Sequence, residues 1–328
     1  MAKYSMKRSN RRNRGGPEPA TTTLTYEMPT ATGAGVSRYI DLFADLSRLN
    51  RKLIRQGHLA YIAGVTVTDD VGVTSALDVQ IRCAGNNWVT HNAWTKGAAL
   101  FKEMNQEVLE SNPSVQGKWA DFKVLLTENQ ASVNTIDALD GAAGAWPAGA
   151  EWEYSRFVIP QHDVDPVTGA VLPAEEWTAC LVGPDDVPNK RFSLVKAYEE
   201  SRATVQDVAP NVPATLPTSF YLKLQDDGSQ DPELAQVIED ANDQPPYPNT
   251  PGTYPGGDGF TNFAGSLVSV ARGVKNDFTP TLQLPGFLAP CGLLYVSAIR
   301  SAGSDNCRIQ IHLASGPARG VMALPMGQ

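Results

Sequence analysis

Two stretches of this sequence alternate apolar and polar residues without interruption, and they limit the possible folds more than any other feature. Residues 76–83, ALDVQIRC, place Val79 and Ile81 on one face and polar or charged side chains on the other. Residues 306–313 repeat the pattern around Ile309 and Ile311. A period of two is the period of a β-strand with one buried face. Such strands need a second layer to cover that face, so we expect a two-layered β-protein.

Composition supports an all-β fold with long loops. The chain has 328 residues, and its 28 glycines and 24 prolines separate short apolar runs along the whole length. No run of 18 apolar residues occurs, which argues against a membrane-spanning helix. With 42% hydrophobic residues the chain can bury a substantial core. About ten or eleven strands are predicted in all. Besides the two above they are 21–28, 61–68, 121–127, 151–160, 176–183, 219–225, 266–271, 292–300 and 320–324.

Helical periodicity interrupts the strand pattern at a few places. We predict a helix that is capped by Ser37 and ends at Gly57, after a turn over 29–36. The clearest helix covers 92–110, where Trp94 begins an apolar stripe that suits core packing. Two weaker helices are predicted at 191–206 and 231–238. Residues 128–150 are expected to form an exposed excursion, and the proline- and glycine-rich residues 244–260 an irregular surface loop.

The first sixteen residues differ in charge from the rest of the chain. They carry a charge of +6 and no acid, so the total of -8 leaves -14 on residues 17–328. A polar segment of this kind cannot bury enough apolar surface to fold alone, so residues 1–20 are predicted to be a disordered arm before a body over 21–328. Clustered basic residues bind the phosphates of nucleic acids or of anionic bilayers. The contact residues are Lys3, Lys7, Arg8, Arg11, Arg12 and Arg14.

Signals for catalysis and for metal binding are weak. The four cysteines are far apart in the sequence, which favours free buried thiols over a disulfide framework or a metal site. The histidines are isolated, and no nucleotide-binding, hydrolase or metalloprotease motif is present. The adjacent acids at 151/153, 175/176 and 185/186 would suit a glycosidase if they faced each other across a cleft. Asp163 and Asp165 could bind calcium, although a polar turn explains them better. We therefore predict no catalytic residues, no metal and no cofactor.

Several blocks resemble the capsid proteins that small circular single-stranded DNA viruses from environmental samples encode. They follow the basic arm in the order SRYIDLFADLSRLNRKLIRQG, WVTHNAWTKGAALFKEMN, WEYSRFVIP, SLVKAYEESRA, PYPNTPGTYPGG, APCGLLYV and GPARGVMALPMG. The resemblance implies a jelly-roll major capsid subunit in a virion, where many copies assemble into an icosahedral shell around the genome. It also implies that the basic arm faces the particle interior. It brings no catalytic residues with it.

The number of strands favours one eight-stranded jelly roll with helical insertions over a double jelly roll of sixteen strands. The short arm departs from the resemblance, because coat proteins that neutralise their genome directly often carry longer basic arms. An internal membrane therefore stays open as a second partner for the arm, beside the single-stranded DNA genome.

Two other functional classes remain open at this stage. A secreted β-sandwich that binds or cleaves carbohydrate would be a monomer with two close carboxylates in a cleft. A nucleic-acid-binding accessory protein would bind DNA as a monomer through residues 1–16, without reading its sequence.

Overall fold

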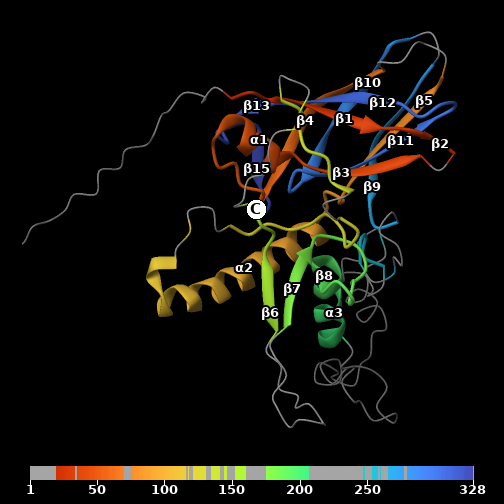
Figure 1. The fold of residues 1–328 in the computed structure, drawn as a ribbon. Coiled ribbons are helices and arrows are strands. Elements are labelled where there is room, and N and C mark those ends of the chain that lie inside the picture. Colours follow the sequence, from red (N-terminus) through yellow and green to blue (C-terminus); the bar gives the residue numbers. More distant parts are fainter. Residues whose placement is uncertain are drawn as a thin grey trace, which may run out of the picture.

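The computed structural model has a mostly β architecture with a helical part inserted into it (Figure 1). Curled antiparallel sheets occupy the upper part of the view, and α2, α3 and a small sheet occupy the lower part. The structure describes residues 20–33, 35–69, 75–115, 117, 121–130, 134–140, 144–145, 152–159, 175–206, 247, 253–257, 259, 265–276 and 279–327.

Sheet A is the first layer of the sandwich. Its strands lie in the order β1, β12, β4, β10, with β15 as a further neighbour of β4, and all of these pairings are antiparallel. The first strand of the chain therefore pairs with β12, from near the C-terminus. The strand bounds are Thr23–Pro29 (β1), His58–Asp69 (β4), Thr281–Pro290 (β10), Asn306–Leu313 (β12) and Ala323–Pro325 (β15).

Sheet B is the second layer. Its order is β2, β11, β5, β9, and β3 pairs antiparallel with β11 on the same side as β2. A two-stranded ribbon of β13 and β14 follows β12 in the chain. The bounds are Ala31–Thr32 (β2), Val36–Asp41 (β3), Leu77–Cys83 (β5), Val268–Lys275 (β9), Leu293–Arg300 (β11), Ser315–Gly316 (β13) and Gly320–Val321 (β14).

The alternating strands bury the faces that the sequence predicts. On β5, Val79 and Ile81 are fully buried, and on β12 the same holds for Ile309 and Ile311. These side chains join one cluster that also contains residues of β1, β4 and α1, such as Tyr26. The apolar space between the two sheets is therefore the main core of the protein.

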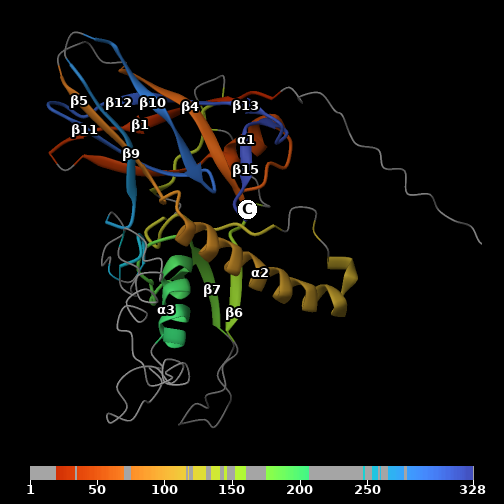
Figure 2. The ribbon, with the colours of Figure 1, turned by 180° about the vertical axis from the view of Figure 1, so that it is seen from behind.

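Residues 84–267 form an insertion between β5 and β9. Cys83, at the end of β5, is paired with Val268, at the start of β9, so the insertion leaves and returns at neighbouring strand ends. Figure 2 shows α2 and α3 below the sheets, with α2 extending to one side. The elements are α2 (Trp88–Ser111), a 3-10 turn (Pro113–Val115), α3 (Leu194–Gln206) and a sheet of β6 (Arg156–Ile159), β7 (Glu175–Cys180) and β8 (Arg191–Ser193).

A second apolar cluster fixes the insertion to the sandwich. It combines Phe122 and Phe157 of the insertion with Tyr39 and Tyr295 of sheet B. The rings of Tyr39 and Tyr295 meet edge to face, with their centroids 5.1 Å apart. The insertion therefore packs against the end of the sandwich from which it leaves.

The helix predicted from Ser37 to Gly57 is wrong in its first part. Residues 36–41 form β3, which pairs with β11, and the helix α1 covers only Leu42–Asn50. Its N-cap is Asp41, whose side chain accepts a hydrogen bond from the Ala44 backbone N–H, and it ends at Arg51, whose φ is 53°. Because α1 continues directly from β3, the apolar residues of a buried strand and of a helix merged into one apparent helical stripe.

Other boundaries also differ from the prediction. Residues 121–127 form an isolated bridge at Leu125 instead of a strand, and the turn at 29–36 contains β2. The predicted strands at 151–160 and 176–183 are shorter than expected, and the predicted helix at 191–206 begins with β8. The helix predicted over 92–110 is confirmed as α2, which begins four residues earlier because Asn87 caps it.

The 128–150 segment is not purely an exposed excursion. Among its described residues, Ala138 is buried and Ile136 packs against the main core. The Leu139 backbone N–H donates to the Thr25 carbonyl of β1 at 2.7 Å. The predictions for 219–225, 231–238 and most of the 244–260 loop lie outside the described residues.

The burial of the alternating strands leads to a first prediction. Val79→Asp or Ile311→Asp should abolish folding, because each places an unpaired charge in the main core. We expect a cost of roughly 4 kcal/mol or more, against a total stability of about 5–15 kcal/mol. Gln310→Asp is the matched control, since Gln310 lies beside Ile311 on the opposite face, and it should cost below about 1 kcal/mol. Circular dichroism during thermal melting measures all three, and cooperative melting of both core variants would contradict the assigned faces.

Candidate interaction surface

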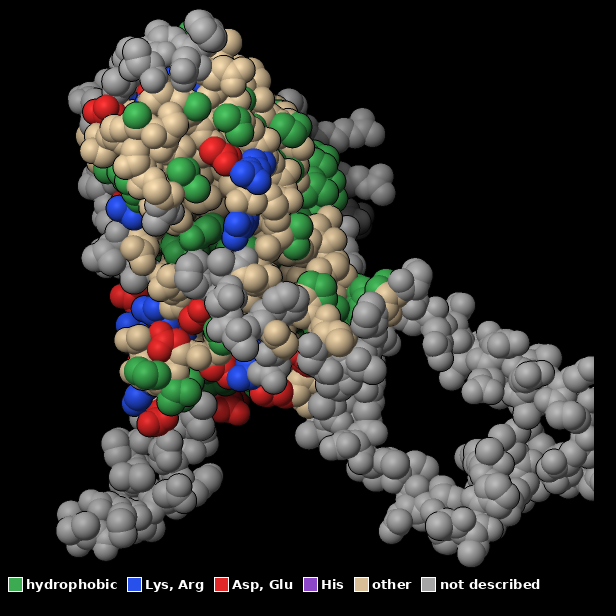
Figure 3. Space-filling view, turned by 90° about the vertical axis from the view of Figure 1, so that its right-hand side faces the viewer, with side chains coloured by type: hydrophobic (Ala, Val, Ile, Leu, Met, Phe, Trp, Pro, Cys, Tyr) green, Lys and Arg blue, Asp and Glu red, His purple; other side chains and the backbone are tan. Residues whose placement is uncertain are grey.

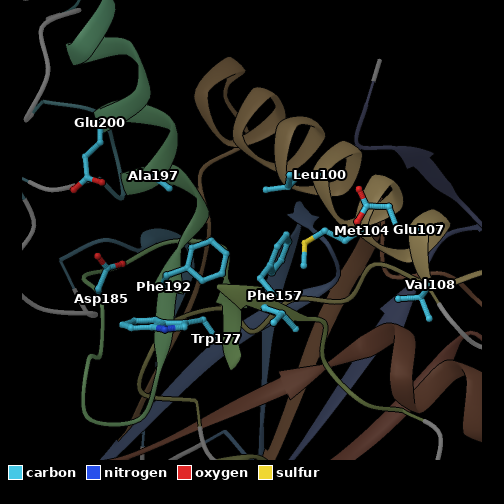
Figure 4. A pocket seen from close by; sticks show the side chains of 11 residues that line it. Leu100, Met104, Glu107, Val108, Phe157, Trp177, Asp185, Phe192, Ala197 and Glu200 are labelled. Carbon is cyan, nitrogen blue, oxygen red and sulfur yellow. The ribbon is translucent and has the colours of Figure 1, made fainter. Parts of the chain in front are cut away.

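A groove with an apolar floor lies between α2, α3 and the small sheet of the insertion. Its volume is about 870 Å³, and Figure 4 shows the side chains that converge on it. The helices supply Leu100, Met104, Glu107, Val108, Ala197 and Glu200, and the sheet and its flanks supply Phe157, Val158, Trp177, Asp185 and Phe192.

Aromatic packing forms the floor of the groove. Phe157 of β6 meets Phe192 of β8 edge to face, with centroids 5.2 Å apart, and Phe101 of α2 lies 6.1 Å from Phe157. At the edge of the groove, Leu100 and Val108 are 51% and 57% exposed. The spacing of eight residues puts both on one side of α2. The groove therefore offers an apolar surface to solvent.

Charged residues at the rim are held by ion pairs within the insertion. Lys196 lies 2.9 Å from an oxygen of Asp185 and 3.8 Å from an oxygen of Glu200. Asp185 also accepts a hydrogen bond from the Ser193 backbone N–H. These acids therefore organise the start of α3. The apolar part of the groove suits the packing of apolar side chains.

A buried network of polar groups lies on the other side of the junction, around Asp41 and Asp45. Asp41 accepts hydrogen bonds from the Trp152 indole N–H and from the Gln56 amide, both at 3.0 Å. Asp45 accepts one from the Tyr26 hydroxyl at 2.8 Å. These bonds link β1, the end of β3, α1, the loop before β4 and residue 152 of the insertion.

Arg48 forms ion pairs with two carboxylates of this network, Asp45 and Asp137. Arg48 lies 3.2 Å from an oxygen of Asp45 and 2.5 Å from an oxygen of Asp137. Burial raises the pKa of Asp45 to about 7, although the Tyr26 hydrogen bond and Arg48 act in the opposite direction. Burial likewise raises the pKa of Asp41 to about 6. The sequence analysis missed this network. Its only signal was a pair of aspartates four residues apart within an apolar segment.

A second buried ionic cluster joins the two sheets at the far end of the sandwich. Asp69 of β4 lies 2.8 Å from Lys275 of β9 and 2.8 Å from Arg300 of β11, and all three side chains are 1% exposed. Burial alone would raise the pKa of Asp69, but hydrogen bonds from Arg300 and Lys275 lower it to about 2. Asp69 is therefore ionised at neutral pH.

The acids of the pairs at 175/176 and 185/186 take part in ion pairs or hydrogen bonds. Glu176 binds Arg156, and Glu175 binds Lys190. Asp186 accepts hydrogen bonds from Asn189. The described residues contain no group of three or more metal-binding side chains. Glu151, Asp163 and Asp165 lie outside the described residues.

The described thiols agree with the sequence analysis. All four cysteines are free and buried.

The six basic residues of the arm, Lys3, Lys7, Arg8, Arg11, Arg12 and Arg14, lie outside the described residues. In the part of the chain that the structure describes, no helix has both the length and the hydrophobicity needed to cross a membrane.

Comparison with known proteins assigns no family. No protein-family model, no curated protein and no solved structure matches this chain.

The raised pKa values of Asp41 and Asp45 lead to a prediction about stability and pH. Each carboxyl group binds its proton more tightly in the folded state than at the ordinary value of 3.8, so the free energy of unfolding should fall as the pH rises from about 4 to about 7. One pKa unit corresponds to about 1.4 kcal/mol. Asp45→Asn removes one titrating group and should make this decline smaller.

Denaturant unfolding at a series of pH values measures the effect. Asp305→Asn is the control, because Asp305 is an exposed residue outside the network. An Asp45→Asn variant with the same pH dependence as the wild-type protein would contradict the assignment.

Proposed function

We propose that this protein is a virion structural protein, the major capsid subunit of a small single-stranded DNA virus, with a single jelly-roll body. The observation that carries the proposal is the pairing of the eight principal strands. In chain order these are β1, β3, β4, β5, β9, β10, β11 and β12. The first pairs with the eighth, the second with the seventh, the third with the sixth and the fourth with the fifth.

This nested pairing is what results when one long antiparallel hairpin rolls up into two sheets. Rolling places the eighth strand beside the third and the seventh beside the fourth. The corresponding pairings here are β12 with β4 and β11 with β5. Two sheets built from two Greek keys define the jelly roll, a fold that viral capsid domains use. Fold alone does not assign a function, so the proposal also depends on the arm and on the resemblance of the sequence blocks.

The strand count supports one jelly roll instead of two. Among the described residues, the eight principal strands form both sheets together with the short strands β2 and β15, and the strands of the insertion form a separate small sheet. The insertion lies between β5 and β9, the fourth and fifth principal strands. The double jelly roll, which the sequence analysis kept as an alternative, would need a second set of eight strands.

The basic arm supplies the contact with the genome. It precedes β1 directly, and its six charges can neutralise phosphates without a folded binding site. Many arms inside one shell would act together, which increases binding strongly over that of one arm. The body then sets the symmetry of the shell and performs no catalysis.

Negative-stain microscopy of the purified recombinant protein tests the proposal. Closed shells of uniform diameter are expected. A protein that stays monomeric in the presence and absence of single-stranded DNA would overturn the proposal. Carbohydrate binding by that monomer would favour the secreted β-sandwich, and DNA binding through residues 1–16 would favour the accessory protein.

The arm should bind polyanions without regard to base sequence. If all six basic residues contact a single strand, log K should fall with log salt at a slope near -4, from about -0.7 per contact. Replacing Arg8, Arg11, Arg12 and Arg14 together by Ala should remove most of this slope. Fluorescence anisotropy with labelled oligonucleotides measures it, and anionic vesicles test the membrane alternative.

Deletion of residues 1–16 is the control, and it should leave the melting temperature of the body nearly unchanged. Binding that survives the four replacements, or that depends on base sequence, would place the contact outside the arm.

A further inference from the structure

The small sheet of the insertion has two chemically different faces. Phe157 and Phe192 line the groove beside α2 and α3. Arg156, Thr178 and Arg191 are paired with one another across β6, β7 and β8, so they form a row on the opposite face. Neighbouring strands lie about 4.8 Å apart, which separates the two arginine backbones by roughly 10 Å. Two guanidinium groups therefore flank one hydroxyl on this face.

This row lines a second pocket, which has a volume of about 480 Å³. Arg48 of α1 contributes a third guanidinium group to the lining, and Asp137, Trp152 and Glu153 of the insertion contribute acidic and aromatic side chains. The pocket therefore lies where the insertion meets the sandwich.

Two of the three arginines are held in place by groups of the protein. Arg48 forms ion pairs with Asp45 and Asp137, and its side chain is 17% exposed. Arg191 donates to the Glu128 backbone carbonyl, and its side chain is 23% exposed. Because these side chains are already oriented, a ligand that binds them loses little affinity to the ordering of side chains.

The third arginine is accessible to a ligand. Charged side chains of both signs gather on the lower, inserted part of the molecule and are sparse on the sandwich above it (Figure 3). Arg156 is 61% exposed and forms an ion pair with Glu176 at 3.1 Å. An exposed ion pair contributes little to stability, so Arg156 can exchange Glu176 for a ligand carboxylate.

An aromatic wall stands beside the arginines. The Trp152 indole N–H donates to Asp41 at 3.0 Å, and Lys123 Nζ lies 5.0 Å from the centre of the Trp152 ring. Tyr154, which also lines the pocket, donates to Asp41 and accepts from the Gln130 amide, both at 3.4 Å. The buried network around Asp41 therefore fixes the orientation of this wall.

The lining suits a sugar ring with one negative charge. Its three arginines and two acids, Asp137 and Glu153, give the described lining residues a net charge of +1. A guanidinium group binds a carboxylate through two parallel hydrogen bonds. Sugar hydroxyls can donate to the two acids, and the C–H face of a sugar ring packs on an aromatic side chain. A phosphate group with two charges would be repelled more strongly by the same acids.

We infer that this pocket binds a sugar that carries a single carboxylate group, such as a uronic acid. Arg156 and Arg191 bind the carboxylate, Trp152 packs against the ring, and Asp137 and Glu153 accept hydrogen bonds from its hydroxyls. The inference goes beyond the proposed function and does not depend on the formation of shells. In an assembled particle, such a site would bind acidic glycans.

Ligand-observed NMR titration of the purified full-length protein tests the pocket. The probes share one ring: glucuronate has one negative charge, glucose has none, and glucose 6-phosphate has up to two. We expect glucuronate to bind at least about tenfold more tightly than glucose, and more tightly than glucose 6-phosphate. Glucuronate that binds no more tightly than glucose would overturn the inference. Tighter binding of a deoxynucleoside monophosphate would overturn it in favour of a nucleotide site.

Three variants locate the binding. Arg156→Gln should weaken glucuronate binding about tenfold and leave glucose binding unchanged. Arg272→Gln is the matched control, because Arg272 is also 61% exposed and ion-paired but lies on β9, and it should change neither. Glu153→Gln removes one repelling acid, so it should increase the affinity for glucose 6-phosphate relative to glucuronate. Equal losses in Arg156→Gln and Arg272→Gln, with unchanged thermal melting, would place the binding outside the pocket and overturn the inference.

The failure of the inference is distinguishable from the failure of the proposed function. Closed shells whose subunits do not bind glucuronate overturn the inference alone. Binding of glucuronate through Arg156 by a protein that stays monomeric overturns the proposed function alone.

Discussion

The sandwich depends on the backbone ladder between its first strand and its last long strand. Thr23 and His312 are 289 positions apart in the chain, yet they are paired neighbours on β1 and β12. β12 also separates β1 from β4, so sheet A stays open until the C-terminal part of the chain is in place. The main core lies between the two sheets, so its apolar surface is fully buried only after β1 and β12 have paired. Folds dominated by such distant pairings fold slowly, and a body of this kind is exposed to aggregation until it closes.

Buried charges mark the two ends of the sandwich, whereas its middle is apolar. The Asp69 cluster ties β4 of sheet A to two strands of sheet B at one end. The Asp41 network ties β3, α1 and the insertion together at the other end. Burying ions costs free energy that their pairing offsets only in part, so these groups add little net stability. They instead penalise a shifted strand register, because a shift would leave a charge buried without its partner.

The sequence allowed the alternating strands and the long helix to be predicted because each has a period that no other element produces. The β3–α1 segment was misread, since residues 36–41 gain their strand conformation from pairing with β11, which local periodicity does not show. β10 was missed altogether. Its Pro285 is an unusual strand residue, tolerated because β10 is an edge strand of sheet A. The groove of the insertion was also missed. The apolar residues along α2 have the same spacing whether they pack in a core or line a half-exposed groove.

The close approach of the two ends of the insertion has a consequence for how proteins of this type can diversify. Cys83 and Val268 are held side by side by the ladder between β5 and β9, whatever lies between them in the chain. The entropic cost of closing a loop rises only slowly with its length, by about 0.6 kcal/mol for each doubling. Lengthening a loop within the segment therefore changes the stability of the sandwich little, provided that the apolar contacts around Tyr39 and Tyr295, the packing of Ile136 and Ala138 and the Trp152–Asp41 hydrogen bond are kept. A lineage could vary the size, charge and outline of this region almost freely while the strands that close the sandwich stay the same.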